Sequence, residues 1–236
     1  MKTKKDLSRA ILLLLSAVIC QCCSHTDLKA QQETREVSDF TRIEYSLSYH
    51  LEIKQADKAG LVLEGDKDAI DKIITKVENG TLQIYNKNHI SNNDDIKIFV
   101  TVVNLEKLSL SGSGDAVFTT DLKSDNLNME ISGSGNINIP KLTAVGVDLK
   151  VTGSGDIEAS GTVKEKLDIG ITGSGSVKAA GLQAKEVQVE ITGSGSAEVN
   201  ATVKLRTDIT GSGSVLYKGS PLIDARIVGS GSTKPF

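Results

Sequence analysis

The chain has 236 residues with a formal net charge of −3, and 39% of them are hydrophobic, enough to bury a core. Acidic and basic residues are interspersed and only 3% of residues are aromatic, so the sequence lacks the basic stripe and the stacking side chains of a nucleic-acid binder. Its 22 glycines, three prolines and alternating Val and Ile instead predict many short strands joined by tight turns.

The first 30 residues have the pattern of a cleaved signal peptide. An apolar stretch, Ile11–Cys20, is too short to span a bilayer as a mature helix. Basic residues precede it: Lys2, Lys4, Lys5 and Arg9. We expect cleavage after Ala30 and an extracytoplasmic location, which means the periplasm, the outer-membrane surface or the medium.

All three cysteines lie in this segment, at Cys20, Cys22 and Cys23. Lipid anchoring at one of them is the alternative to simple cleavage, although the residues before each match a lipobox poorly. The mature chain would then contain no cysteine, which excludes disulfides, zinc-thiolate sites and a cysteine nucleophile.

Residues 31–104 predict irregular β coils that continue into the rest of the chain. Alternating apolar residues predict strands from Tyr45 to Ile53 and from Ile96 to Val102, with a shorter one at Leu61 and Leu63. Asp66 is placed to cap a short helix over Asp68–Ile74. Asn79-Gly80 predicts a hairpin turn.

Residues 105–236 form a repeat whose constant element is Gly-Ser-Gly. The motif begins at seven positions: Gly112, Gly133, Gly153, Gly173, Gly193, Gly211 and Gly229. Apolar residues alternate before and after each motif, and a further apolar position closes most repeats: Leu122, Leu142, Val163, Leu182, Val203 and Leu222. A period of 18 to 21 residues with flanking strands is typical of a solenoid.

The predicted fold is therefore all-β, a right-handed parallel β-helix (β-solenoid) with about 20 residues per coil, irregular N-terminal coils and one short helix. Successive coils would stack about 4.8 Å apart, so that each buries the apolar face of the next. Gly-Ser-Gly would form the sharp corner, because glycine adopts positive φ without a Cβ penalty. Right-handedness follows the strong preference of parallel crossovers.

The chain resembles the family described as "putative auto-transporter adhesin, head GIN domain". The resemblance rests on Arg35–Ile43, on Asn79-Gly80-Thr81-Leu82, and on Leu105–Leu108 running into Ser111–Asp115. It covers about residue 35 to the C-terminus. It implies a secreted bacterial β-helix protein with no established activity.

Asp115 and Asp156 are the best candidates for a rival, enzymatic function, since each directly follows Gly-Ser-Gly. Two coil steps would place them about 10 Å apart, near the upper limit for an inverting pair of glycosidase carboxylates. Asp and Asn are also good corner residues. Asn136 and later serines take the equivalent position, which favours the structural interpretation.

Other chemistry has weaker support. The loop Asn92–Asp95 is acidic enough to hold a cation, but an ordinary solvated loop explains it better. His50 on a strand and His89 in a loop lack partners for nucleophilic catalysis. We therefore assign no catalytic, cofactor-binding or metal site and expect no cofactor.

The sequence predicts a non-enzymatic secreted or cell-envelope scaffold of the adhesin type. Its partner would be a surface glycan or a protein, and association with further copies, end to end or face to face, is a third possibility. The alternative is a polysaccharide-active β-helix enzyme using Asp115 and Asp156.

Overall fold

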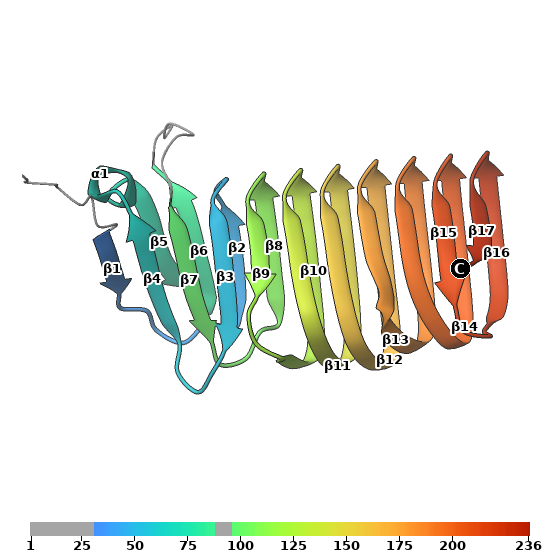
Figure 1. Ribbon diagram of the computed structural model, residues 1–236, viewed down its shortest axis with the longest axis horizontal. Helices are drawn as coiled ribbons and strands as arrows, with labels where there is room; N and C mark the ends of the chain where they lie inside the picture. The colour runs from blue at the N-terminus through green and yellow to red at the C-terminus, as the bar shows by residue number, and fades with distance from the viewer. Residues whose placement is uncertain (1–30, 88–95) are drawn as a thin grey trace, which may run out of the picture.

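The computed structural model describes residues 31–87 and 96–236. The predicted signal peptide, His89 and the loop Asn92–Asp95 lie outside the described residues. The described strands form one 17-stranded sheet that winds into an elongated parallel solenoid (Figure 1). Within these ranges, no helix is long and apolar enough to cross a membrane.

The N-terminal part contains the shorter elements. They are β1 (Gln31–Arg35), β2 (Arg42–Ser46), β3 (His50–Gln55), β4 (Gly60–Gly65), α1 (Lys67–Ile70), β5 (Ile73–Glu78), β6 (Thr81–Asn86) and β7 (Lys97–Val102). The repeat contains β8 (Lys107–Gly112), β9 (Asp115–Phe118), β10 (Leu122–Gly133), β11 (Asn136–Gly153), β12 (Asp156–Gly173), β13 (Ser176–Gly193), β14 (Ser196–Gly211), β15 (Ser214–Lys218), β16 (Leu222–Gly229) and β17 (Ser232–Pro235).

Each coil of the repeat is flattened, with two faces joined by one sharp corner and one wide bend (Figure 1). One strand, such as β11, covers the second face, the bend and the first face in turn. Face 1 contains β5, β6, β2, β8, the C-terminal halves of β10 to β14, and β16. Face 2 contains β1, β4, β7, β3, β9, the N-terminal halves of β11 to β14, β15 and β17.

The register confirms the predicted coil length. Val147 pairs with Leu167 and Leu167 with Val187, a step of 20 residues each time. Val187 then pairs with Leu205, a step of 18. Inward side chains of both faces meet in one core, and all of these four residues are buried.

The predicted closing positions of the repeats are only partly correct. Leu122, Leu142, Val163 and Leu182 are buried at the wide bend, but Val203 is 52% exposed and Leu222 is 78% exposed. The coil that contains Val203 is two residues shorter, and Ala201 turns inward in its place.

Gly-Ser-Gly forms the sharp corner, as predicted. Gly173 has φ +117°, and a Cβ there would lie 2.5 Å from the carbonyl oxygen of Gly153. That carbonyl accepts a hydrogen bond from the backbone N–H of Ser174 at 2.9 Å. The close approach that glycine permits is therefore what joins one corner to the next.

The N-terminal coils do not stack in chain order. β2 lies between β6 and β8, and β3 lies between β7 and β9. The first coil of the chain, β2 and β3, thus lies between the coil of β6 and β7 and the coil of β8 and β9. The alternation of apolar and polar residues in the sequence does not encode this order. The interval expected as one strand, Tyr45 to Ile53, divides into β2 and β3 at a corner, where the Tyr45 hydroxyl donates to the carbonyl of Tyr49 at 2.9 Å.

The hairpin turn is confirmed and the helix is shorter than predicted. Asn79 (φ 50°) and Gly80 (φ 74°) join β5 to β6 with Glu78 paired to Thr81, as in a type I′ turn. Asp66 caps α1 by accepting from the N–H of Asp68 at 2.9 Å. The helix ends at Ile70, because the β-branched run from Ile73 forms β5.

Candidate functional site

Asp115 and Asp156 lie in a ladder at the corner, with Asn136 between them. Asp115 Oδ1 accepts from the Asn136 amide Nδ2 at 2.7 Å, and Asn136 Oδ1 accepts from the backbone N–H of Asp156 at 3.3 Å. Asp156 Oδ1 in turn accepts from the backbone N–H of Ser176 at 3.1 Å. The carboxylates therefore hold neighbouring coils together, which is the structural interpretation of these residues.

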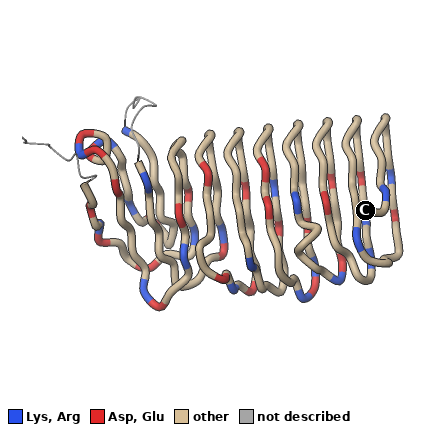
Figure 2. Tube along the Cα trace, in the orientation of Figure 1, with Lys and Arg blue, Asp and Glu red and all other residues tan. Residues whose placement is uncertain are grey.

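His50 lies on β3, where its Nε2 is 3.7 Å from Glu52 Oε1 in a half-exposed pair. Residues 31–87 and 96–236 contain no group of three or more His, Cys, Asp or Glu side chains that could hold a metal ion. Charges of both signs are interspersed along the coils (Figure 2), and many pair across or along strands, as Lys107 Nζ does with Glu130 at 3.0 Å.

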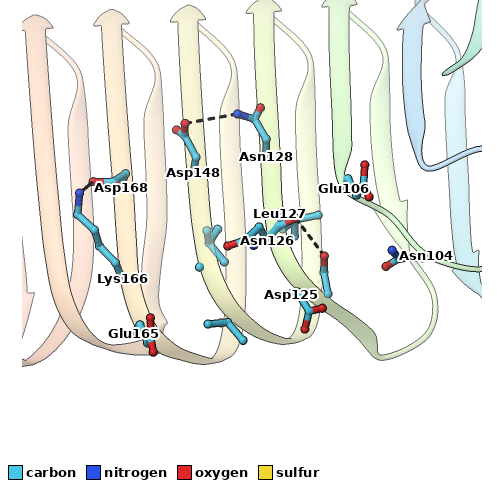
Figure 3. A pocket seen from close by; sticks show the side chains of 14 residues that line it. Asn104, Glu106, Asp125, Asn126, Leu127, Asn128, Asp148, Glu165, Lys166 and Asp168 are labelled. Atoms are coloured by element: carbon cyan, nitrogen blue, oxygen red, sulfur yellow. Dashed lines mark hydrogen bonds and ion pairs between the residues drawn. The ribbon is translucent and has the colours of Figure 1, made fainter. Parts of the chain in front are cut away.

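An open groove of about 760 Å³ lies where the wide bend runs into face 1. It crosses four successive segments: the β7–β8 connection, β10, β11 and β12 (Figure 3). We call it the polar groove. Its lining residues are Asn104, Glu106, Ser124, Asp125, Asn126, Leu127, Asn128, Val145, Gly146, Val147, Asp148, Glu165, Lys166 and Asp168.

The coil register explains why these side chains line up. Asn128 pairs with Asp148 and Asp148 with Asp168, so three polar side chains stand in one outward row on face 1. Asn126 pairs with Gly146 in the next row. A Cβ on Gly146 would lie 2.9 Å from Asn126 Oδ1, so the missing side chain leaves room for the asparagine to lie across β11.

A register shift shapes the far end of the groove. Between β11 and β12 the pairing moves from Ala144–Val163 to Gly146–Lys166, so β12 carries one extra residue at the bend. Such a bulge bends the strand locally. It brings Glu165 and Lys166 to the groove.

Hydrogen bonding in the groove is incomplete. Asn128 Nδ2 donates to Asp148 Oδ2 across 3.4 Å, a long contact. Asn128 Oδ1 is buried and has no hydrogen-bond partner within the described part of the chain. An unpaired buried oxygen costs free energy.

The lysines near the groove are neutralised by its own carboxylates. Lys166 Nζ lies 2.7 Å from Asp168 Oδ1, and Lys150 Nζ lies 2.7 Å from Asp148 Oδ2. The hydrogen bond to Asp148 raises the pKa of Lys150 above its usual value. No ion pair joins Asp125 or Glu165 to another residue of 31–87 or 96–236, and carboxylates outnumber ammonium groups in the lining.

The sequence did not predict this groove. Its signal is the recurrence of Asn128, Asp148 and Asp168 at 20-residue steps beside the run Ser124-Asp125-Asn126. Outward polar residues occur in every coil, so this recurrence has meaning only once the bend and the bulge are known.

A family model described as "Putative auto-transporter adhesin, head GIN domain" matches residues 39–221. No curated protein matches the chain.

Several solved structures share the fold. A putative adhesin from Bacteroides fragilis has 28% identity and a TM-score of 0.84, over 89% of this chain and 98% of that one. A putative lipid binding protein from Parabacteroides distasonis has 29% identity and a TM-score of 0.74, over 89% and 98%. A putative adhesin from Parabacteroides merdae, at 20% identity and a TM-score of 0.72 over 89% and 97%, shares the fold.

Proposed function

The chain belongs to the family of putative auto-transporter adhesins with a head GIN domain, and from that premise we propose that it is a non-enzymatic, adhesin-like protein whose polar groove binds a neutral, hydroxyl-rich glycan. The solenoid serves as the rigid scaffold that presents the groove. The fold itself does not carry this conclusion, because one fold serves many functions.

The unpartnered Asn128 Oδ1 is the observation that carries the proposal. A donor from a ligand would satisfy this buried acceptor once the Asn128 side chain turns towards the groove, and sugar hydroxyl groups are such donors. Asn126 and Asp125 add further acceptors within the same groove. Because the groove crosses several coils, it suits an extended chain rather than a single small molecule.

The charge of the groove supports a neutral ligand. Asp125 and Glu165 would repel an acidic polysaccharide, and the only lysine in the lining, Lys166, is already paired with Asp168. No aromatic side chain lines the groove for stacking on a sugar ring. We therefore expect weak binding at each groove, strengthened where several grooves engage one polymer.

The enzymatic alternative has less support. Asp115 and Asp156 each have an oxygen engaged in the corner ladder, and Asn136 separates them. The family and the Bacteroides fragilis structure carry adhesin names rather than enzyme names.

Lipid binding, suggested by the name of the Parabacteroides distasonis relative, is also less well supported. The inward row of each repeat is filled by tightly buried side chains such as Leu149 and Ile169. The polar groove offers carboxylates and amides rather than an apolar slot for an acyl chain.

The adhesin family favours a place at the cell surface, and we propose that residues 1–30 direct export there. Labelling cells with a radioactive lipid precursor tests the two routes. Simple cleavage predicts an unlabelled protein that begins after Ala30, whereas label lost in Cys20, Cys22 or Cys23 variants would establish a lipid anchor.

A glycan array probed with the purified protein tests the proposed ligand class. We expect binding to neutral glycans, and we expect Asn128→Ala to weaken the affinity at least tenfold. A tenfold change in affinity corresponds to about 1.4 kcal/mol, which is the free energy of one or two hydrogen bonds. Asn138→Ala is the matched control, because Asn138 is exposed on face 2, away from the groove.

Gly146→Ala is a second probe that removes no polar group. The new methyl group would displace Asn126 and lower binding while the thermal midpoint changes little. Binding confined to acidic glycans, or neutral-glycan binding that both variants retain in full, would contradict the proposal.

A further inference from the structure

The two ends of the solenoid are finished differently. At the N-terminal end, β5 pairs antiparallel with β6, and β4 pairs antiparallel with β7, so the parallel stack stops there. Helix α1 adds buried Ala69 and Ile70 at the same end (Figure 1). This end therefore has a built cap.

At the opposite end, no strand of residues 31–87 or 96–236 pairs with the outer side of β16, which is therefore an open edge of the described sheet. It pairs with β14 on one side, and all eight of its residues are exposed. Exposure reaches 78% for Leu222, 47% for Ile223 and 54% for Val228. A long apolar edge strand with free backbone N–H and C=O groups invites another strand.

The rows of inward-facing side chains on face 1 end at β16. Ile223 and Ile227 are in register with buried Leu205 and Ile209 of β14. They therefore occupy core positions that lack a following coil among the described residues. Covering them would bury apolar surface that the stack buries everywhere else.

The sequence of β16 is complementary to itself in the antiparallel direction. Ala225 is the centre of the strand segment Leu222-Ile223-Asp224-Ala225-Arg226-Ile227-Val228. Two apolar residues lie at each end of this segment, and residues of opposite charge flank Ala225. Antiparallel pairing centred on Ala225 places Asp224 opposite Arg226 of a second copy, and Arg226 opposite Asp224. It also places Ile223 opposite Ile227 on the core side and Leu222 opposite Val228 on the outer side.

From this symmetry we infer that β16 forms a two-fold, end-to-end dimer with β16 of a second copy of the chain. Opposite charges and apolar pairs directly across an antiparallel ladder are the favourable combinations. The contact is isologous, so it closes at two copies instead of growing into a fibre.

Head-to-tail stacking does not fit the other end. The free side of β5 is occupied by Arg35, whose Nη1 donates to the carbonyl of Ile73 at 2.7 Å and to Thr75 Oγ1 at 3.1 Å. The remaining partner for the β16 edge is therefore β16 of a second copy. The inferred dimer would join the two copies of face 1 into one sheet, so that both polar grooves lie on the same side of a rigid body.

Sedimentation of the purified full chain over a range of concentrations tests the dimer. We expect a reversible monomer–dimer equilibrium in the wild type. Asp224→Arg places like charges opposite each other twice per dimer, as Arg226→Asp also does, so each variant alone should weaken the dimer more than about tenfold.

Mixing the two variants supplies the decisive comparison. In a mixed dimer, the arginines of one chain face the aspartates of the other, so dimers should return and contain one copy of each variant. Any fraying of β16 caused by either substitution within its own chain is present before and after mixing. Glu158→Arg makes the same charge change on face 2 and should leave the equilibrium unchanged.

Three outcomes would overturn the inference. They are a wild type that stays monomeric at millimolar concentration, one that forms open-ended assemblies, and single variants that dimerise as tightly as the wild type. A mixture that remains monomeric would equally exclude the register centred on Ala225.

Discussion

A Cβ placed on Gly173 would lie 2.5 Å from the carbonyl oxygen of Gly153, the equivalent residue one coil earlier. The same carbonyl accepts from the backbone N–H of Ser174. The two facts have one cause: the corners approach so closely that only a residue without a side chain fits. The repeat of Gly-Ser-Gly is thus a packing requirement of the stack.

Gly173→Ala should destabilise the protein by about 2–4 kcal/mol, because it combines backbone strain at φ +117° with a clash against backbone. Gly170→Ala is the matched control in the same coil, where a Cβ would meet only Lys150 Cγ at 3.7 Å. Denaturant midpoints measure both. Equal midpoints for the two variants would show that the corner does not require glycine.

Asp156→Ala should lower the free energy of unfolding by about 1 kcal/mol, since the hydroxyl and the backbone N–H of Ser176 both lose the Asp156 carboxylate as an acceptor, although the N–H keeps its bond to the Gly155 carbonyl. Asp156→Asn should stay close to the wild type, because an amide oxygen accepts in the same way, as Asn136 does one coil earlier. Neither substitution should alter glycan binding. Loss of a glycan-cleaving activity in both variants would instead favour the enzymatic alternative.

Tyr45→Phe should make the free energy of unfolding fall less steeply as the pH rises above about 10. Burial raises the pKa of the Tyr45 phenol far above its usual 10.0, so the unfolded chain releases this proton near pH 10 while the folded chain retains it. The stability that the protonated Tyr45 phenol contributes is therefore fully present below about pH 10. It is lost as the pH rises towards the pKa of Tyr45 in the folded protein.

Urea titrations at pH 8 and pH 11 measure this effect. The variant should be about 1 kcal/mol less stable at pH 8, because the hydrogen bond to the Tyr49 carbonyl is missing. The difference should shrink at pH 11. A constant difference at both pH values would mean that Tyr45 ionises in the folded protein as it does in the unfolded chain.

Arg35→Lys should loosen the N-terminal cap. The guanidinium donates to the carbonyls of Ile73 at 2.7 Å and Ile70 at 3.0 Å, and it pairs with Glu33 at 2.7 Å. One ammonium cannot reproduce this fork. Amide hydrogen exchange in Lys67–Ile70 should accelerate roughly tenfold, which corresponds to about one lost hydrogen bond.

Arg42→Lys is the control for the cap, since the Arg42 guanidinium donates to the Asn79 carbonyl and to Thr81 at the hairpin instead. Exchange in α1 should not respond to it. If Arg35→Lys also left α1 unchanged, the helix would be held by its own contacts and by the Asp66 cap.

Those parts of the fold that follow local rules were predictable from the sequence. Gly-Ser-Gly marked each corner, Asn79-Gly80 marked the hairpin, and Asp66 marked the start of the helix. Each signal acts through the φ angles or the hydrogen bonds of its own segment. The stack then follows because every coil repeats the same pattern.

The arrangements that depend on contacts between distant segments were not predictable. The insertion of β2 between β6 and β8 is decided by which edges remain free, and the sequence pattern does not carry that information. The exposure of Val203 follows from a coil two residues shorter. The polar groove needs both the bend and the bulge before Asn128 acquires its setting.

Side-chain amide NMR resonances of the asparagines, followed during titration with a neutral glycan selected from the array, test the groove most directly. Binding in the polar groove predicts shifts for Asn126 and Asn128 that saturate together, while Asn138 on face 2 stays constant. Shifts at Asn138 with none at Asn126 and Asn128 would place the ligand elsewhere and contradict the proposed function.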